Sequence, residues 1–127
     1  MADVRKMKET MIIIGSGAAG LSVALEFAKN GTRSILISDM PSERAQSVMA
    51  EGGINAAVDT QEDSPELHAE ETMKAGRYIA DSKAVHQMTK EAPKIIKDLF
   101  EAGMAFTLNE DKKPDVRAFG GQSVKRT

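Results

Sequence analysis

The chain has 127 residues, of which 41% are hydrophobic and 28% are charged, and its formal net charge is −2. This length suffices for one domain, and the composition is ordinary for a globular protein. The mixed charges exclude a basic nucleic-acid patch, and the absence of cysteine excludes disulfides and cysteine-ligated metal centres. No apolar run approaches the ~20 residues of a membrane span.

The first predicted element is a buried strand over residues 11–14, which passes directly into a glycine-rich turn. Helical spacing follows over 21–29, and residues 34–38 form a second predicted strand. Together they make a β-α-β unit of the size that a dinucleotide-binding fingerprint requires. The turn has the pattern G-x-G-x-x-G in Gly15, Ser16, Gly17, Ala18, Ala19 and Gly20.

The three glycines of this turn have distinct physical roles in a dinucleotide site. Gly15 permits the tight turn, Gly17 leaves room for a pyrophosphate, and Gly20 lets the helix pack close to the strand. The helix start then offers free N–H groups and a positive dipole end to the phosphates. The alternative interpretation is a glycine turn in some other α/β protein.

The end of the second predicted strand is where a Rossmann unit often places an acidic residue against ribose hydroxyls. Ser38 falls at that position and Asp39 follows it, so either side chain could serve. Sites for NAD and for FAD both use such a residue. The motif alone therefore does not separate the two cofactors.

Three helices are predicted in the middle of the chain, and each begins at a residue suited to a helix start. Ser64 and Asp81 are cap candidates, and Pro93 restarts a helix. Gly76 is expected to break or kink the first of them. The predicted helices cover residues 67–75, 82–89 and 93–102. A weak strand over 104–108, a polar turn and a partner strand over 116–119 complete the prediction.

The histidines and the acidic pairs of this region give no sign of a reactive site. His68 and His86 lack partners at the spacing of a metal or catalytic site, which predicts surface or half-buried positions. The pairs at 62–63 and 70–71 are interpreted as solvated faces, because charges are rarely buried unpaired. No metal site and no catalytic residue is assigned to this chain.

The segment after the second strand resembles a known family. Residues 36–53 (LISDMPSERAQSVMAEGG) look like the flavin-binding loop of the fumarate reductase / succinate dehydrogenase flavoproteins, a family that also includes L-aspartate oxidase. The match continues over 54–58 (INAAV) and returns over 116–127 (VRAFGGQSVKRT). The Phe-Gly-Gly form in the last segment favours fumarate reductase or succinate dehydrogenase over aspartate oxidase.

The resemblance implies FAD as the cofactor and hydride transfer between the flavin and succinate or fumarate as the reaction. Arg44 is implied as a loop anchor. Without the resemblance, the turn at 51–53 would be interpreted as an ordinary one. The remaining implied cofactor residues near the isoalloxazine are Gln46, Ser47, Glu51, Gly52 and Gly53, and the implied border of the dicarboxylate site is Phe119, Gly120 and Gly121.

Two positions depart from the family pattern. Gln46 stands where many members have the histidine that carries the flavin covalently, and a carboxamide is not a usable nucleophile, so the FAD is expected to be non-covalent. Asp39 stands where the family has a lysine, which removes a cation near the adenosine half of the cofactor and puts that contact in doubt.

The predicted fold class is α/β, a Rossmann-like FAD-binding β-α-β unit with following helices and an incomplete domain. Residues 1–10 are expected to be a tail and 11–127 the N-terminal portion of an FAD-binding domain, apparently truncated, since family members are several times longer. The isolated chain is therefore expected to be inactive. Alternatives are a fragment of an L-aspartate-oxidase-like flavoenzyme and a non-catalytic nucleotide-binding module.

The partners and the location that the resemblance implies are those of a soluble flavoprotein within a larger assembly. The implied partners are a dicarboxylate substrate in the complete protein and an iron–sulfur subunit, with no nucleic acid and no direct membrane span. The implied location is cytoplasmic, or peripheral to the inner face of the membrane through partner subunits.

Overall fold

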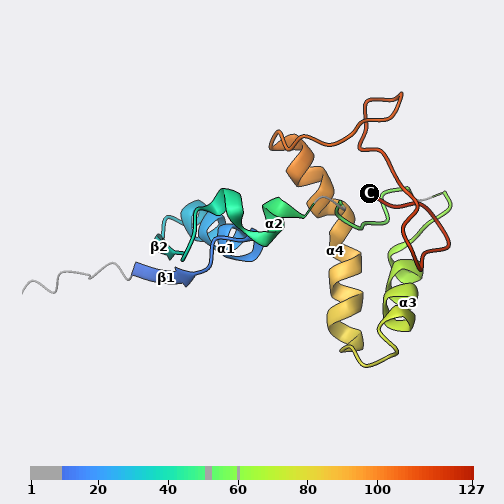
Figure 1. Ribbon diagram of the computed structural model, residues 1–127, viewed down its shortest axis with the longest axis horizontal. Helices are drawn as coiled ribbons and strands as arrows, with labels where there is room; N and C mark the ends of the chain where they lie inside the picture. The colour runs from blue at the N-terminus through green and yellow to red at the C-terminus, as the bar shows by residue number, and fades with distance from the viewer. Residues whose placement is uncertain (1–9, 51–52, 60) are drawn as a thin grey trace, which may run out of the picture. The chain divides into compact units, whose positions relative to one another are not determined.

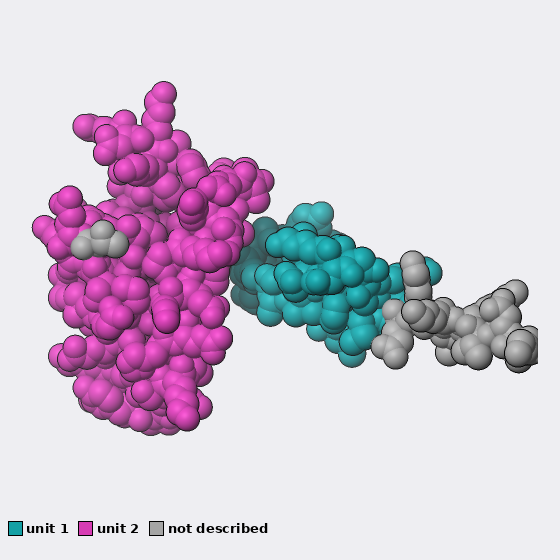
Figure 2. Space-filling view, turned by 180° about the vertical axis from the view of Figure 1, so that it is seen from behind, with its two compact units in different colours: residues 1–52 teal, residues 53–127 magenta. Residues whose placement is uncertain are grey.

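The computed structural model describes residues 10–50, 53–59 and 61–127. The chain divides into two units, residues 1–52 and residues 53–127, which Figure 2 distinguishes by colour. Among the described residues, no helix is both long enough and apolar enough to cross a membrane.

The first unit is a β-α-β unit, as the sequence predicts. Strand β1 (Thr10–Ile14) leads into helix α1 (Ala18–Lys29), which leads into strand β2 (Arg33–Ile37). The strands are parallel, with Thr10 opposite Arg33 and Ile14 opposite Ile37. A single 3₁₀ turn, η1 (Ser42–Arg44), and one turn of helix, α2 (Gln46–Met49), follow.

Helix α1 ends where the sequence predicts, because Gly31 takes up a left-handed conformation with φ of +68°. The N–H of Gly31 donates to the carbonyl of Ala28 at 3.0 Å, and that of Thr32 donates to Phe27 at 2.8 Å. This pair of hydrogen bonds is the Schellman motif, which satisfies the last carbonyls of a helix. The chain can then return at once into β2.

The two faces of the small sheet differ in their cover. Ile13 is buried on the side of α1, where it lies close to Gly20. Successive strand residues point to opposite faces, so the neighbours of Ile13 belong to the other face. That face is formed by two register pairs of isoleucines, all of them well exposed in this unit: Ile12 opposite Ile35, and Ile14 opposite Ile37.

The second unit is built on a pair of helices that lie side by side, α3 (Pro65–Ala75) and α4 (Ser82–Glu101) (Figure 1). The Oγ of Ser64 accepts the N–H of Leu67 at 3.0 Å, which is the cap that the sequence predicts. Asp81 caps α4 by accepting the N–H groups of Lys83 and Ala84. Helix α3 ends at Gly76, also as predicted.

The prediction of separate helices over 82–89 and 93–102 is wrong, because α4 runs unbroken through Pro93. An interior proline removes one backbone hydrogen bond and crowds the preceding turn. The buried face of α4 is formed by Val85, Thr89 and Ile96 and extends on both sides of Pro93. Helix α4 packs against α3 in this unit. Tertiary packing of that face outweighs the local cost.

The prediction of two paired strands over 104–108 and 116–119 is also wrong. Within the described residues 104–127, the pairing is limited to isolated bridges, Leu108 with Pro114 and Arg117 with Arg126. Pro114 has no N–H to extend a ladder. Arg117 pairs with the last residues of the chain, a partner that local spacing does not reveal.

Candidate functional site

The glycine turn of the first unit has the close approaches that the sequence predicts. Gly15 has φ of +106°, a conformation that residues with a side chain rarely adopt. A Cβ on Gly20 would overlap the carbonyl oxygen of Gly15, so only glycine lets α1 begin this close to β1. A Cβ on Gly17 would lie 3.3 Å from the Oγ of Ser47, which is a tight contact.

The first turn of α1 offers backbone donors, though one fewer than the sequence suggests. Gly17 is the N-cap and supplies no side-chain acceptor. The N–H of Ala18 donates to the Oγ of Ser47 at 2.9 Å. Within the described part of the chain, the N–H groups of Ala19 and Gly20 have no hydrogen-bond acceptor. These two donors and the helix dipole favour an anion at this end of α1.

A hollow lies at the carboxyl ends of the two strands. It is shallow and open to solvent, has a volume of about 360 Å³, and is lined by Ile14, Gly15, Ile37, Ser38 and Asp39. The Oγ of Ser16, which is buried, donates to the Oγ of Ser38 at 2.9 Å and ties the glycine turn to the end of β2. The carboxyl edge of parallel strands is the place where such folds bind ligands.

The other predicted cofactor residues of the first unit follow β2. Arg44 ends η1 and Gln46 begins α2, and both side chains are exposed. Ser47 lies at the start of α1 through its hydrogen bond to Ala18. Glu51 and Gly52 lie outside the described residues.

In the second unit, the structure brings two of the predicted site residues together. A Cβ on Gly53 would lie 3.5 Å from the Cζ of Phe119, so the phenyl ring sits next to this glycine. Gly120 and Gly121 follow in an exposed turn. One residue predicted on the flavin side and one predicted on the dicarboxylate side are thus neighbours, although they are far apart in the sequence.

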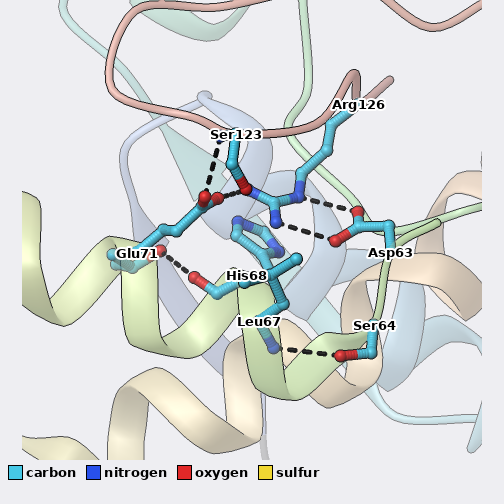
Figure 3. A network of polar contacts seen from close by, with 8 residues as sticks. Asp63, Ser64, Leu67, His68, Glu71, Ser123 and Arg126 are labelled. Carbon is cyan, nitrogen blue, oxygen red and sulfur yellow. Dashed lines mark hydrogen bonds and ion pairs between the residues drawn. The ribbon is translucent and has the colours of Figure 1, made fainter.

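A buried ionic network, which was not predicted from the sequence, lies in the second unit and is drawn in Figure 3. The Arg126 residue is only 1% exposed, and its guanidinium makes a bidentate pair with Asp63, with both N–O distances 2.8 Å. Its third nitrogen donates to Glu71 at 2.6 Å. The other oxygen of Glu71 accepts the backbone N–H of Ser123 at 2.8 Å.

Residues of this network shift one another's pKa values. Hydrogen bonds to Asp63 raise the pKa of Arg126 above its ordinary value, against the opposing effect of burial. Burial alone would raise the pKa of Glu71, but the hydrogen bonds from Ser123 and Arg126 outweigh it and hold that pKa below its usual value. Both effects favour the charged forms of Arg126 and Glu71.

His68 and two of the acidic residues correct the sequence predictions. His68 is 3% exposed rather than at the surface, and its Nδ1 has no hydrogen-bond partner among the described residues. Burial lowers the pKa of His68, and Arg126 lowers it further. Asp63 is buried and Glu71 is half-buried, whereas their sequence neighbours Glu62 and Glu70 are exposed, as expected.

One sequence signal could have found this network. His68 and Glu71 are three residues apart on α3, so they share a face, and Asp63 lies just before the cap of the same helix. The sequence does not reveal that a cation from the far end of the chain meets them.

Comparison with known proteins decides the family. Residues 10–127 match the family described as FAD binding domain. The chain belongs to this family. The resemblance inferred from the glycine turn, the flavin loop and the Phe-Gly-Gly segment is thereby confirmed, as are the α/β fold class and FAD as the family's cofactor.

Relatives of this FAD-binding domain include enzymes of three kinds. It is 42% identical over 121 residues to one subunit of the CoM/CoB fumarate reductase of Methanothermobacter marburgensis, covering 92% of this chain and 22% of that protein. It is 37% identical to the succinate dehydrogenase flavoprotein subunit of Bacillus subtilis, covering 94% and 21%. It is 38% identical to L-aspartate oxidase 2-b of Nicotiana tabacum, covering 90% and 17%.

Solved structures agree with this assignment. The Sdh1 complex of Mycobacterium smegmatis in its apo form superposes with a TM-score of 0.85 at 31% identity, covering 93% of this chain and 21% of that one. A quinol-fumarate reductase with menaquinol superposes with a TM-score of 0.84 at 30% identity, covering 94% and 22%. The chain thus spans about a fifth of the length of the relatives it matches.

Proposed function

We propose that this FAD-binding domain serves an oxidoreductase that transfers a hydride between the flavin and a four-carbon dicarboxylate, succinate or fumarate. The observation that supports it most directly is the start of α1. There the glycine turn closes against β1 and the N–H groups of Ala19 and Gly20 have no acceptor among the described residues. This is the geometry that receives a pyrophosphate.

The residues of the first unit fit FAD at its adenosine diphosphate end. A pyrophosphate accepts hydrogen bonds and carries negative charge, and the two open N–H groups supply the donors. Ser38 and Asp39 line the hollow at the strand ends, and we assign them to the ribose hydroxyls. Asp39 would accept hydrogen bonds from these hydroxyls, whereas the lysine that the family has at this position is a cation.

The roles of the remaining residues are proposed from the resemblance. Bound FAD supplies a ring that accepts or donates a hydride. We assign Arg44 to anchoring the flavin loop. For the second unit, we assign Phe119, Gly120 and Gly121 to the dicarboxylate side, supported by the contact of Phe119 with Gly53. The flavin-side residues proposed with Gly53 are Gln46, Ser47, Glu51 and Gly52.

The flavin is held without a covalent bond in this proposal. Gln46, at the start of α2, has no nucleophilic atom for the flavin methyl carbon, and the chain has no cysteine. His68 is buried within its own unit, and the Nδ1 of His86 lies 2.7 Å from the carbonyl of Ser82. Acid precipitation of the FAD-loaded protein should leave all the yellow colour in the supernatant. Flavin fluorescence on the denatured polypeptide band would refute this.

L-Aspartate is the competing substrate, because aspartate oxidases are among the relatives at similar identity. The Phe-Gly-Gly segment at 119–121 favours succinate and fumarate. A protein that carries this chain together with the further segments of its relatives should reduce fumarate with a reduced viologen dye. Oxidation of L-aspartate with no fumarate reduction would favour the competing assignment.

The isolated chain should bind flavin but not turn over fumarate. Positioning can contribute roughly 7–11 kcal/mol to lowering a barrier, and the relatives have about four-fifths of their length outside the matched region. We place the carboxylate clamps and the proton donor in those further segments. Appreciable fumarate reduction by the pure 127-residue chain would contradict that placement. FAD binding without turnover in any longer form would favour a non-catalytic module.

We propose that the whole protein works at the inner face of a membrane, together with an iron–sulfur subunit. Relatives are described as subunits, and one solved relative is a complex. Affinity purification of the whole protein from its own cells, followed by iron analysis, tests this. Recovery of the flavoprotein alone and free of iron would contradict it.

A further inference from the structure

The turn that carries Phe119, Gly120 and Gly121 belongs to a loop that is closed at its base. Arg117 and Arg126 exchange two backbone hydrogen bonds, of 2.8 and 2.9 Å, and residues 118–125 form the loop between them. We call residues 118–125 the closing loop. The base of the closing loop is this single bridge, so contacts beyond the base contribute to its direction.

The direction of the closing loop is fixed by two carboxylates of the same unit. Arg126 holds the loop base to Asp63 through a bidentate pair, and to Glu71 on α3. The second oxygen of Glu71 holds the middle of the loop through the N–H of Ser123. In Figure 3, Glu71 and Asp63 lie at opposite ends of the Arg126 guanidinium, with His68 beneath it.

The closing loop and the residue that follows Arg126 both meet the segment beginning at Gly53. The N–H of Ala56 donates to the carbonyl of Thr127 at 3.0 Å, and Ala56 is fully buried. Phe119 lies against Gly53. A shift of Arg126 would therefore change where the phenyl ring of Phe119 sits, although the two residues are seven positions apart along the chain.

Buried ion pairs are weak evidence for stability, because apolar residues of similar volume often stabilise as well. A bidentate arginine does supply what apolar contacts lack, which is a fixed orientation. We propose that Arg126 is a positioning residue, whose pairs with Asp63 and Glu71 hold Phe119 and the two following glycines in place beside Gly53. This inference rests on the proposed dicarboxylate role of those residues.

The contact between Phe119 and Gly53 can be observed directly by NMR. The α-hydrogen of Gly53 that points toward the phenyl ring should have a ring-current shift. The difference in its chemical shift between wild type and Phe119→Leu gives the size of that contribution. Arg126→Lys keeps the charge but loses the bidentate geometry. In the full chain it should remove at least half of that shift, while resonances of the buried Ile96 on α4 keep their dispersion.

A milder variant and a matched control complete the test. Glu71→Gln keeps an acceptor for the N–H of Ser123 but removes one charge from the network. It should therefore cause a smaller loss of the Gly53 shift. This variant replaces Arg126→Lys in the test if Arg126→Lys unfolds the unit. Lys94→Ala removes an exposed ion pair of 2.6 Å with Asp98 on α4 and should leave the shift unchanged.

Three results would overturn the inference. The Gly53 shift could survive both network variants, it could respond equally to Lys94→Ala, or it could disappear only together with the dispersion of Ile96. Failure of the wild-type chain to bind FAD would instead remove the proposed function and leave the shift measurement standing.

Discussion

His68 is the residue whose environment most clearly links burial to pH. Burial lowers its pKa, and the neighbouring Arg126 lowers it further, while Asp63 and Glu71 offset this only in part. In the unfolded chain the pKa of His68 is near its ordinary value of about 6.5, whereas in the folded chain this pKa is lower. Folding is therefore favoured above that value, and this contribution is lost as the pH falls below it.

The predicted result is a wild-type free energy of unfolding that falls between about pH 7.5 and about pH 5.5, by no more than about 1.4 kcal/mol per pH unit from this residue. His68→Gln cannot titrate and should lose this part of the pH dependence. His86→Gln, on the exposed side of α4, should keep it. Urea unfolding followed by circular dichroism measures all three. Equal slopes for wild type and His68→Gln would contradict the prediction.

At the scale of helices, Schellman motifs end α1, α3 and α4 in the described chain, and the motif after α3 lacks glycine at its left-handed position. Gly31 and Gly103 hold the left-handed position after α1 and α4, with φ of +68° and +92°. After α3 that position is Arg77, with φ of 54°, whose N–H donates to Lys74 while that of Tyr78 donates to Met73. A side chain in this conformation is strained.

Arg77→Gly should therefore raise the free energy of unfolding by about 0.5–1 kcal/mol, since the relief of strain exceeds the extra chain entropy of glycine. Gly103→Ala should lower it by a similar amount or more. Thermal and urea unfolding measure both. A less stable Arg77→Gly variant would show that the arginine side chain makes a compensating contribution.

Local elements could be predicted from the sequence because their causes lie within a few residues. The β-α-β unit follows from the glycine turn, and the caps at Ser64 and Asp81 follow from adjacent side chains. The unbroken α4 could not be predicted, because the packing of its buried face outweighs the local cost of Pro93. Helical spacing places His68 and Glu71 on one face, but their cation could not be predicted, since Arg126 meets Asp63 and Glu71 across 63 and 55 residues.

For the whole molecule, the uncovered face of the sheet governs behaviour in solution. Ile12 is 65% exposed and Ile14 is 86% exposed, with Ile35 and Ile37 beside them in register. Parallel sheets normally have both faces packed, and contiguous apolar patches promote association. The isolated chain is therefore expected to self-associate.

Replacing Ile14 and Ile37 together by threonine keeps the β-branched shape and removes apolar area from this face. The double variant should sediment as a smaller species than wild type at equal concentration. Val85→Thr, in the buried core of the other unit, is the control and should not reduce association. Identical association of wild type and the double variant would show that the contact lies elsewhere.

The glycine turn and the open start of α1 are expected to bind FAD rather than NAD. Isothermal titration calorimetry of the wild-type chain with each cofactor measures this preference. We expect measurable heat of binding with FAD, weaker or no binding with NAD, and loss of FAD binding in Gly17→Val, because its side chain would press on Ser47 and fill the phosphate approach. Gly31→Asn, in the open turn after α1, should bind FAD as wild type does. Tighter binding of NAD than of FAD would contradict the account.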